Sequence, residues 1–167
     1  MKMFVQNFVA VVFWLAVSGS TVFASTDDPR VNRDPNKARF VTSDIDNFWR
    51  AFDAAGKETD REKKIAIFEN EYLNKGSLGL QDFVRLRIKT ARDLVETIDR
   101  LPKFYASVRP STLRIAHMEK KMRMTFYRFK RIYPEAAFPD VYFVVGIANT
   151  GGTDCERLLF VVAWPSR

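Results

Sequence analysis

The chain has 167 residues, of which 47% are hydrophobic, and a formal net charge of +7 at pH 7. This length suits one domain with its own hydrophobic core and excludes two domains of ordinary size. Its single cysteine, Cys155, excludes an internal disulfide, so packing has to stabilise the fold, and 15 phenylalanines provide the material for it.

Residues 1–24 have the pattern of a secretory signal peptide. After a positive start, residues 8–17 form a run of ten apolar residues, and Val22 and Ala24 are placed for cleavage before Ser25. A retained membrane anchor is the alternative, but the run is too short to cross a bilayer comfortably. We therefore expect an exported protein, periplasmic or secreted, with no transmembrane span after cleavage. An exported basic protein meets anionic envelope surfaces first, which argues against nucleic acid as a partner.

The mature chain begins with a polar segment. Residues 25–42 contain two prolines, which predicts an exposed lead-in before a single domain at residues 43–167. Ser43 is placed to cap a first helix, and Asp44 and Asp46 fall in its first turn.

Three further helices are predicted. The second is expected to end at Gly76, because glycine tolerates the left-handed conformation common at helix ends. The third follows Ser77 and continues to Pro102. After a short connection, Ser111 is expected to cap the fourth and longest helix, which ends before Pro134.

The apolar period then changes. Residues 141–146 (VYFVVG) and 157–162 (RLLFVV) are short, continuous and rich in β-branched and aromatic side chains, as buried strands are. The predicted fold class is therefore α+β and mainly helical, with about four helices followed by a small C-terminal β-hairpin or sheet.

Metal and nucleophilic chemistry find little support in the residues. Zinc requires three or four ligands drawn from His, Cys, Asp and Glu. The chain has one histidine, His117, and one cysteine, Cys155, and neither lies in a motif with ligand spacing. Lys121 occupies the position four residues after His117 and would repel a cation. A Cys155–His117 nucleophilic pair would require the last turn to fold back onto the long helix, which the spacing does not support.

The fourth predicted helix carries a candidate basic surface. Six basic side chains lie on the flanks and back of its apolar stripe: Lys120, Lys121, Arg123, Arg128, Lys130 and Arg131. Met124 and Tyr127 share the back face. A solvated face is the simplest interpretation. The alternatives are phosphate contacts with an aromatic platform, as in nucleic-acid binding, or a face covered by further protein.

Residues 146–154 (GIANTGGTD) form a second candidate site. Gly151 and Gly152 permit positive φ, and Asn149 and Thr153 can bond neighbouring amides. The spacing is not GxGxxG and no helix pattern follows, which argues against dinucleotide binding. Taken alone, the segment predicts a tight hairpin connection.

Several stretches in this order resemble a bacterial family of predicted zinc-dependent proteases, catalogued as a domain of unknown function. They are SDIDNFWRAFDAA, FENEYLNKGSLGLQDFVRLRI, LPKFYASVRPSTL, RIYPEAAFPDVYFVVG and NTGGT, and the resemblance covers roughly residues 44–153. It implies a helical N-terminal half, a short sheet and then an HExxH helix that binds zinc and supplies a general base. The matching turn residues are Gly146, Asn149, Gly151, Gly152 and Thr153. By analogy with other zinc peptidases, such strands line a cleft and bind an extended substrate by edge pairing.

The sequence departs from the family pattern after Thr153, and it contains no HExxH. The resemblance therefore implies zinc for full-length relatives only and no cofactor in this chain. Our first hypothesis is an exported protein equivalent to the non-catalytic front part of such a protease, truncated and inactive by itself. The alternative is a self-sufficient periplasmic binding module that uses the basic helix to contact anionic envelope surfaces or a protein partner.

Overall fold

The computed structural model describes residues 31–149, 154–155 and 158–162. The predicted signal peptide and Gly151, Gly152 and Thr153 lie outside these residues. The α-helices are α1 (Ser43–Ala55), α2 (Arg61–Phe68), α3 (Leu78–Phe83), α4 (Ala91–Arg100), α5 (Pro102–Arg114) and α6 (Glu119–Ile132). Short π-helical or 3-10 segments extend three of them: η1 (Glu69–Leu73), η2 (Val84–Ile88) and η3 (Ile115–Met118). The strands are β1 (Phe40–Val41), β2 (Asp140–Val144), β3 (Asp154–Cys155) and β4 (Leu158–Val162). The predicted α+β, mainly helical class is confirmed.

The strands form one sheet in the order β1-β2-β4-β3. β1 and β4 both run parallel to β2, with β4 in register from Asp140 opposite Leu158 to Val144 opposite Val162. The predicted tight hairpin between the two apolar runs is therefore wrong. The 13 residues between Val144 and Leu158 are enough to bring the chain back to the starting edge, as a parallel pair requires.

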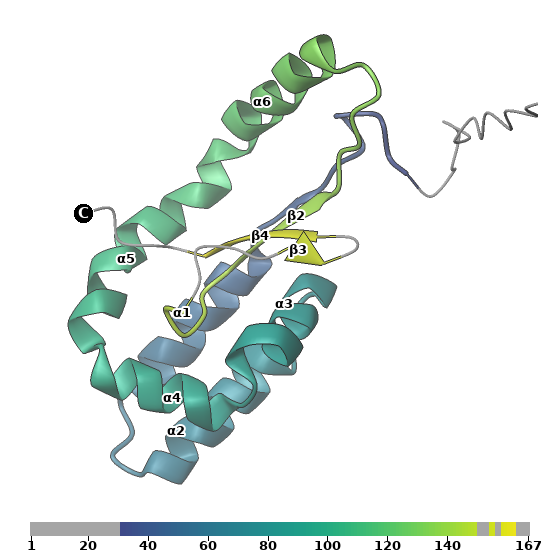
Figure 1. The fold of residues 1–167 in the computed structure, drawn as a ribbon. Helices are drawn as coiled ribbons and strands as arrows, with labels where there is room; N and C mark the ends of the chain where they lie inside the picture. Colours follow the sequence, from purple (N-terminus) through teal and green to yellow (C-terminus); the bar gives the residue numbers. More distant parts are fainter. Residues whose placement is uncertain (1–30, 150–153, 156–157, 163–167) are drawn as a thin grey trace, which may run out of the picture.

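The core lies between the strands and the helices drawn beneath them in Figure 1. Phe48 of α1 is completely buried at its centre. Its ring lies 4.9 Å from Trp49, 5.2 Å from Tyr72 and 5.9 Å from Tyr105 between centroids. Residues 141–145 are all buried, which explains why β2 reads as a continuous apolar run rather than an alternating one.

The third predicted helix is two helices. α3 begins directly after Ser77, as predicted, and the hydroxyl of Ser77 caps it by accepting from the amide of Leu80 at 3.3 Å. The helical path breaks at Lys89, where φ is 74°, and Thr90 caps α4 through the amide of Asp93 at 3.1 Å. The apolar stripe continues on both sides of the break, so periodicity alone could not reveal it.

The fourth predicted helix is also divided, and it begins earlier than expected. Pro102 opens α5, where its missing N–H costs nothing, and the 3-10 segment η3 separates α5 from α6. Ser111 is therefore no cap: it lies inside α5, and its hydroxyl donates to the carbonyl of Val108 at 2.8 Å. Pro110 also lies within α5, whereas the sequence pattern placed it in a connection.

Two other predicted helix signals act differently in the structure. Thr42, not Ser43, occupies the cap position of α1, and its side chain makes no capping bond. Gly76 does not adopt positive φ. A Cβ there would lie 2.5 Å from Cδ2 of Leu80, so close packing is the reason for glycine at this position.

The described part of the lead-in packs on the domain, although Asn36, Lys37 and Arg39 are exposed. Pro35 and Ala38 are buried, and Phe40 and Val41 form β1. Ala38 packs with Ala136 and Phe138 in a small second cluster, against which Phe126 of α6 rests. The segment therefore joins α6 to the sheet.

Candidate functional site

Two tyrosine hydroxyls fix the backbone where β2 ends. Tyr72 donates to the carbonyl of Val145 at 2.7 Å and accepts from its amide at 3.1 Å. Tyr105 donates to the carbonyl of Gly146 at 2.7 Å. Burial raises the pKa of both phenols above the usual value, so both keep their protons. The end of the strand is thus held from two helical segments far apart in sequence.

The residues after β2 depart from strand geometry within four positions. A Cβ on Gly146 would lie 2.6 Å from Cε1 of Phe83, so the backbone passes directly over that ring. Ala148 has φ of 56°, and the exposed Asn149 places its amide nitrogen 3.5 Å from the carbonyl of Arg87. The structure therefore brings Gly146 against the end of α3 and Asn149 against η2.

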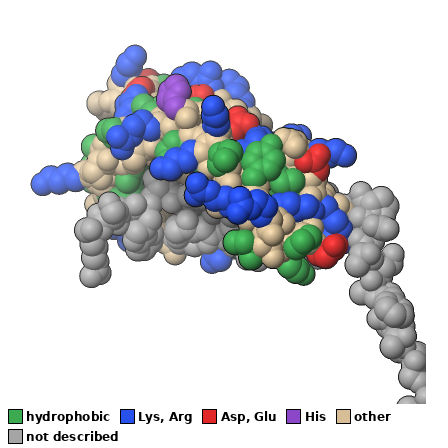
Figure 2. All heavy atoms as spheres, turned by 90° about the horizontal axis from the view of Figure 1, so that it is seen from above, with side chains coloured by type: hydrophobic (Ala, Val, Ile, Leu, Met, Phe, Trp, Pro, Cys, Tyr) green, Lys and Arg blue, Asp and Glu red, His purple; other side chains and the backbone are tan. Residues whose placement is uncertain are grey.

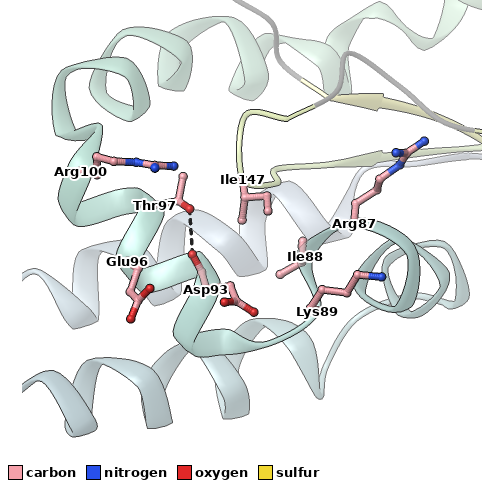
Figure 3. A pocket seen from close by; sticks show the side chains of 8 residues that line it. All are labelled: Arg87, Ile88, Lys89, Asp93, Glu96, Thr97, Arg100 and Ile147. Atoms are coloured by element: carbon pink, nitrogen blue, oxygen red, sulfur yellow. Dashed lines mark hydrogen bonds between the residues drawn. The ribbon is translucent and has the colours of Figure 1, made fainter.

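A hollow of about 500 Å³ lies beside this turn, between η2, α4 and Ile147 (Figure 3). Its lining combines basic, acidic and apolar side chains: Arg87, Ile88, Lys89, Asp93, Glu96, Thr97, Arg100 and Ile147. The strained backbone of Lys89 therefore contributes one wall, and the predicted turn contributes another.

Some of the charged side chains around the hollow have a partner among the described residues, and one does not. Glu96 pairs with Arg61 at 2.7 Å, and Asp93 accepts from the threonine hydroxyl that caps α4 at 2.6 Å. Arg100 has no hydrogen-bond or ion-pair partner among the described residues. Figure 3 shows its guanidinium extending toward the side on which Ile147 lies. The hollow thus offers Arg100 as an available cation, while Lys89 donates to the carbonyl of Arg85 at 2.9 Å. A cation in such a hollow suits a carboxylate or a polar backbone group.

Edge pairing along β2, expected by analogy with other zinc peptidases, is wrong for this strand. β2 lies between β1 and β4, and Tyr72 occupies the backbone groups of Val145 beyond β1. On the outer side of β4, β3 pairs only with Leu158 and Leu159. Residues 160–162 have no strand partner on that side within the described chain, so an extended segment could pair there.

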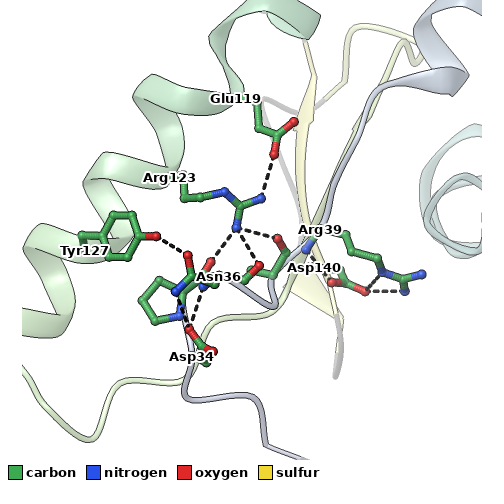
Figure 4. Close-up of polar contacts among 9 residues, drawn as sticks. Asp34, Asn36, Arg39, Glu119, Arg123, Tyr127 and Asp140 are labelled. Carbon is green, nitrogen blue, oxygen red and sulfur yellow. Dashed lines mark hydrogen bonds and ion pairs between the residues drawn. The ribbon is translucent and has the colours of Figure 1, made fainter.

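Arg123 does not belong to the basic surface. Its Nη1 donates to the carbonyls of Pro35, Asn36 and Ala38 at 2.6, 3.2 and 3.0 Å. Its guanidinium also pairs with Glu119 at 2.7 Å (Figure 4). The sequence pattern placed Arg123 with the outward-facing cations, but the folded lead-in turns it into a structural residue.

The other predicted cations divide into two groups. Lys120, Lys121, Arg128 and Arg131 are exposed and have no hydrogen-bond or ion-pair partner among the described residues. Lys130 is half-buried and donates to the carbonyl of Pro134 at 2.5 Å. Four of the six predicted residues therefore form an available basic surface.

Apolar side chains interrupt that surface. Met124 is 46% exposed and Tyr127 36%, in agreement with their predicted place on the back face. Figure 2 shows basic and hydrophobic side chains mixed on the side of the molecule seen from above. None of the residues of α6 is buried, so its packing against the rest of the fold is only partial.

No group of three or more His, Cys, Asp or Glu residues that could hold a metal ion occurs in the described residues. His117 is exposed in η3, and Cys155 belongs to β3. Local sequence patterns gave no sign of the roles of Tyr72, Tyr105 and Arg100. Their positions depend on packing between segments distant in sequence.

Comparison of the chain with protein-family models, with curated proteins and with solved structures gave no match. Among the helices that the structure describes, none has both the length and the apolarity needed to cross a bilayer.

Proposed function

We propose that this chain is an exported protein equivalent to the non-catalytic front part of a predicted zinc-dependent protease, and that it presents a fixed turn and a sheet edge to a polypeptide. The observation that carries the proposal is the convergence of Tyr72 and Tyr105 on the end of β2. Tyr72, Tyr105 and the end of β2 each come from a different stretch that resembles the family.

The packing supports treating those stretches as one unit. SDIDNFWRAFDAA is α1, which supplies Phe48 at the centre of the aromatic core. FENEYLNKGSLGLQDFVRLRI supplies Tyr72, together with Gly79 beneath Tyr142 of β2. LPKFYASVRPSTL belongs to α5 and supplies Tyr105. The residues of the resemblance therefore meet at the strand end instead of being spread over the surface.

A rigid turn is what a binding site requires, because a positioned backbone loses little freedom when a ligand arrives. Two buried hydroxyls hold this turn, and the hollow with Arg100 adjoins it. On the outer side of β4, residues 160–162 have no strand partner among the described residues. A segment paired along β4 gains main-chain hydrogen bonds. An acidic side chain of the bound polypeptide could also reach Arg100. The proposal assigns zinc and bond cleavage to the HExxH segment of full-length relatives.

Binding and cleavage are tested separately with the full chain. The probe is reduced, carboxymethylated and fluorescein-labelled α-lactalbumin, an unfolded acidic polypeptide, and fluorescence anisotropy measures its affinity. We expect saturable binding and no cleavage on a gel, with or without added zinc. Zinc-dependent cleavage would contradict the non-catalytic assignment. Absence of binding would contradict the presenting role.

The matched variants lie on one helix. Arg100→Gln removes the available cation at the hollow and should weaken binding about tenfold, as loss of a charge-assisted hydrogen bond does. Arg92→Gln removes another exposed cation of α4, which pairs with Glu62 of α2 at 3.0 Å, and it should leave affinity unchanged. Equal losses in both variants would show that net charge, not the hollow, attracts the polypeptide.

A further inference from the structure

The end of α6 carries large apolar side chains that the described chain leaves open to solvent. Ile132 is 82% exposed, Tyr133 55% and Phe129 50%. The rings of Phe129 and Tyr133 lie 6.2 Å apart between centroids. We call these three residues the apolar tip. Single exposed apolar residues are ordinary, but a group of this size at the end of a helix marks an interaction surface.

Cations border the apolar tip. Arg128 and Arg131 lie on the same last turns of α6, exposed and without a partner in the described chain. Lys120 and Lys121 extend the basic surface back along the helix. Residues 119–135 include six basic and two acidic side chains, so a partner at this face should be anionic.

The described chain begins beside the apolar tip. The side-chain amide of Asn32 donates to the carbonyl of Phe138 at 2.8 Å, and Arg33 donates to the carbonyl of Glu135 at 2.9 Å. Both acceptors belong to the segment that follows α6, and the ring of Phe138 lies 6.4 Å from that of Phe129. Figure 1 shows the start of the described chain at this end of the molecule.

This position connects the apolar tip with the predicted export segment. Only 13 residues separate Val17, the last of the apolar run, from Val31. Fully extended, such a segment spans at most about 45 Å. The segment that follows the apolar run therefore enters the fold at the end that carries the apolar tip, which keeps this end within reach of a membrane that holds the run during export.

We propose that the apolar tip and its neighbouring arginines bind the surface of an anionic phospholipid bilayer. Aromatic and aliphatic side chains of a helix enter the boundary between headgroups and acyl chains, while adjacent arginines stay at the anionic headgroups. The mixture of exposed Phe, Ile and Tyr with Arg on one helix end supplies both parts. A purely polyanionic partner would use the cations and leave the apolar tip in water. This inference is independent of the proposed polypeptide contact.

A fluorophore on the apolar tip tests the contact in the full chain. With Cys155→Ser as background, Ile132→Cys is labelled with an environment-sensitive dye, and Leu78→Cys on α3, 67% exposed, is the control position. We expect phosphatidylglycerol vesicles to shift the emission of the dye at 132 to shorter wavelength. We also expect phosphatidylcholine vesicles to have little effect at 132, and the dye at 78 to respond to neither. Binding through the N-terminal apolar run alone would not distinguish phosphatidylglycerol from phosphatidylcholine, so the comparison of the two lipids separates the two causes.

Charge variants provide the second measurement. Arg128→Gln with Arg131→Gln should lower the affinity for phosphatidylglycerol vesicles about tenfold or more. Lys57→Gln with Lys63→Gln removes the same charge from exposed positions near α2 and should leave the affinity unchanged. Equal response to both lipids, a response at 78 but not at 132, or no effect of the arginine pair would overturn the proposal. A dye shift at 132 that grows with protein concentration and needs no vesicles would assign the apolar tip to a second copy of the chain instead.

Discussion

The hydroxyl of Tyr72 satisfies both backbone groups of Val145, donating to the carbonyl at 2.7 Å and accepting from the amide at 3.1 Å. A neighbouring strand would normally supply these bonds, but the last register pair of β1 is Val41 opposite Tyr142. A side chain from a helical segment therefore completes the ladder where the strand stops. Since Tyr72 and Val145 are both buried, water does not compete for these groups.

Tyr72→Phe should destabilise the fold by about 2–4 kcal/mol, because it leaves a buried donor and a buried acceptor unpaired while removing little volume. The free energy of unfolding in urea measures the loss. Tyr127→Phe is the control, since its hydroxyl bonds Asn36 at the surface, and it should cost less than about 1 kcal/mol. Equal effects of the two changes would show that the hydroxyl of Tyr72 contributes no special stability.

Gly79→Ala should destabilise the protein by about 1–3 kcal/mol, although alanine is ordinarily the better helix former. A Cβ at this position would lie 2.2 Å from Cγ of Tyr142, a buried ring in the central strand. Gly56→Ala is the comparison, because the nearest atom to its Cβ is a backbone oxygen at 3.3 Å at the exposed end of α1. The midpoint of thermal unfolding of the Gly79→Ala variant should be well below that of Gly56→Ala. The opposite order would contradict close packing of α3 on β2.

Lys89→Gly should stabilise the protein by up to about 1 kcal/mol. Lys89 has φ of 74° and ψ of −67°, and the amide of Thr90 bonds the carbonyl of Ile88 across it at 3.1 Å, a tight turn that is strained for a residue with a Cβ. Lys89→Ala keeps the strain and should not stabilise. A rise in the thermal midpoint for glycine alone is the expected result. A rise for both would point to removal of the charge.

Asp140→Asn should flatten the dependence of stability on pH in acid. Burial raises the pKa of Asp140, but hydrogen bonds from Arg39 at 2.8 Å outweigh it, and the net pKa lies below the usual value. A lowered folded pKa means that the stabilisation is present above the unfolded pKa and is lost as the pH falls through the folded one. Because Arg39 is 68% exposed, the loss should be no more than about 1 kcal/mol.

Urea unfolding at neutral pH and at a series of pH values below 4 tests this dependence. The wild type should lose more stability on acidification than Asp140→Asn. The asparagine can still accept from the amide of Arg39, so the register of β1 and β2 should survive. Parallel curves for the two proteins would show that the pair does not couple to folding.

Several elements could be predicted from local sequence because their signals are local. Asp44 and Asp46 do lie in the first turn of α1, and α3 does begin directly after Ser77. Met122 and Phe126 mark the side of α6 that packs on the core, while Met124 and Tyr127 are exposed. In each case the helical period or the reach of one side chain to the next turn decides the outcome, and neither depends on distant residues.

Arg123 and Tyr72 show why the rest could not be predicted. By period alone Arg123 joins the outer cations, yet the carbonyls of residues 35, 36 and 38 draw its guanidinium inward. Tyr72 reads as a core aromatic, yet it completes a strand 73 residues away. Both roles depend on backbone groups supplied by remote segments.

Composition and hydrophobic period are enough to predict the mainly helical α+β class, the apolar character of the two long strands and the positive charge of α6. Tertiary structure decided that β2 and β4 run parallel, that the break at Lys89 divides one apolar stripe into two helices, and that the turn after β2 is held by Tyr72 and Tyr105. Strand pairing and buried hydrogen bonds satisfy backbone groups wherever the folded chain brings partners together. Because these partners are distant in sequence, no single stretch of the sequence predicts them.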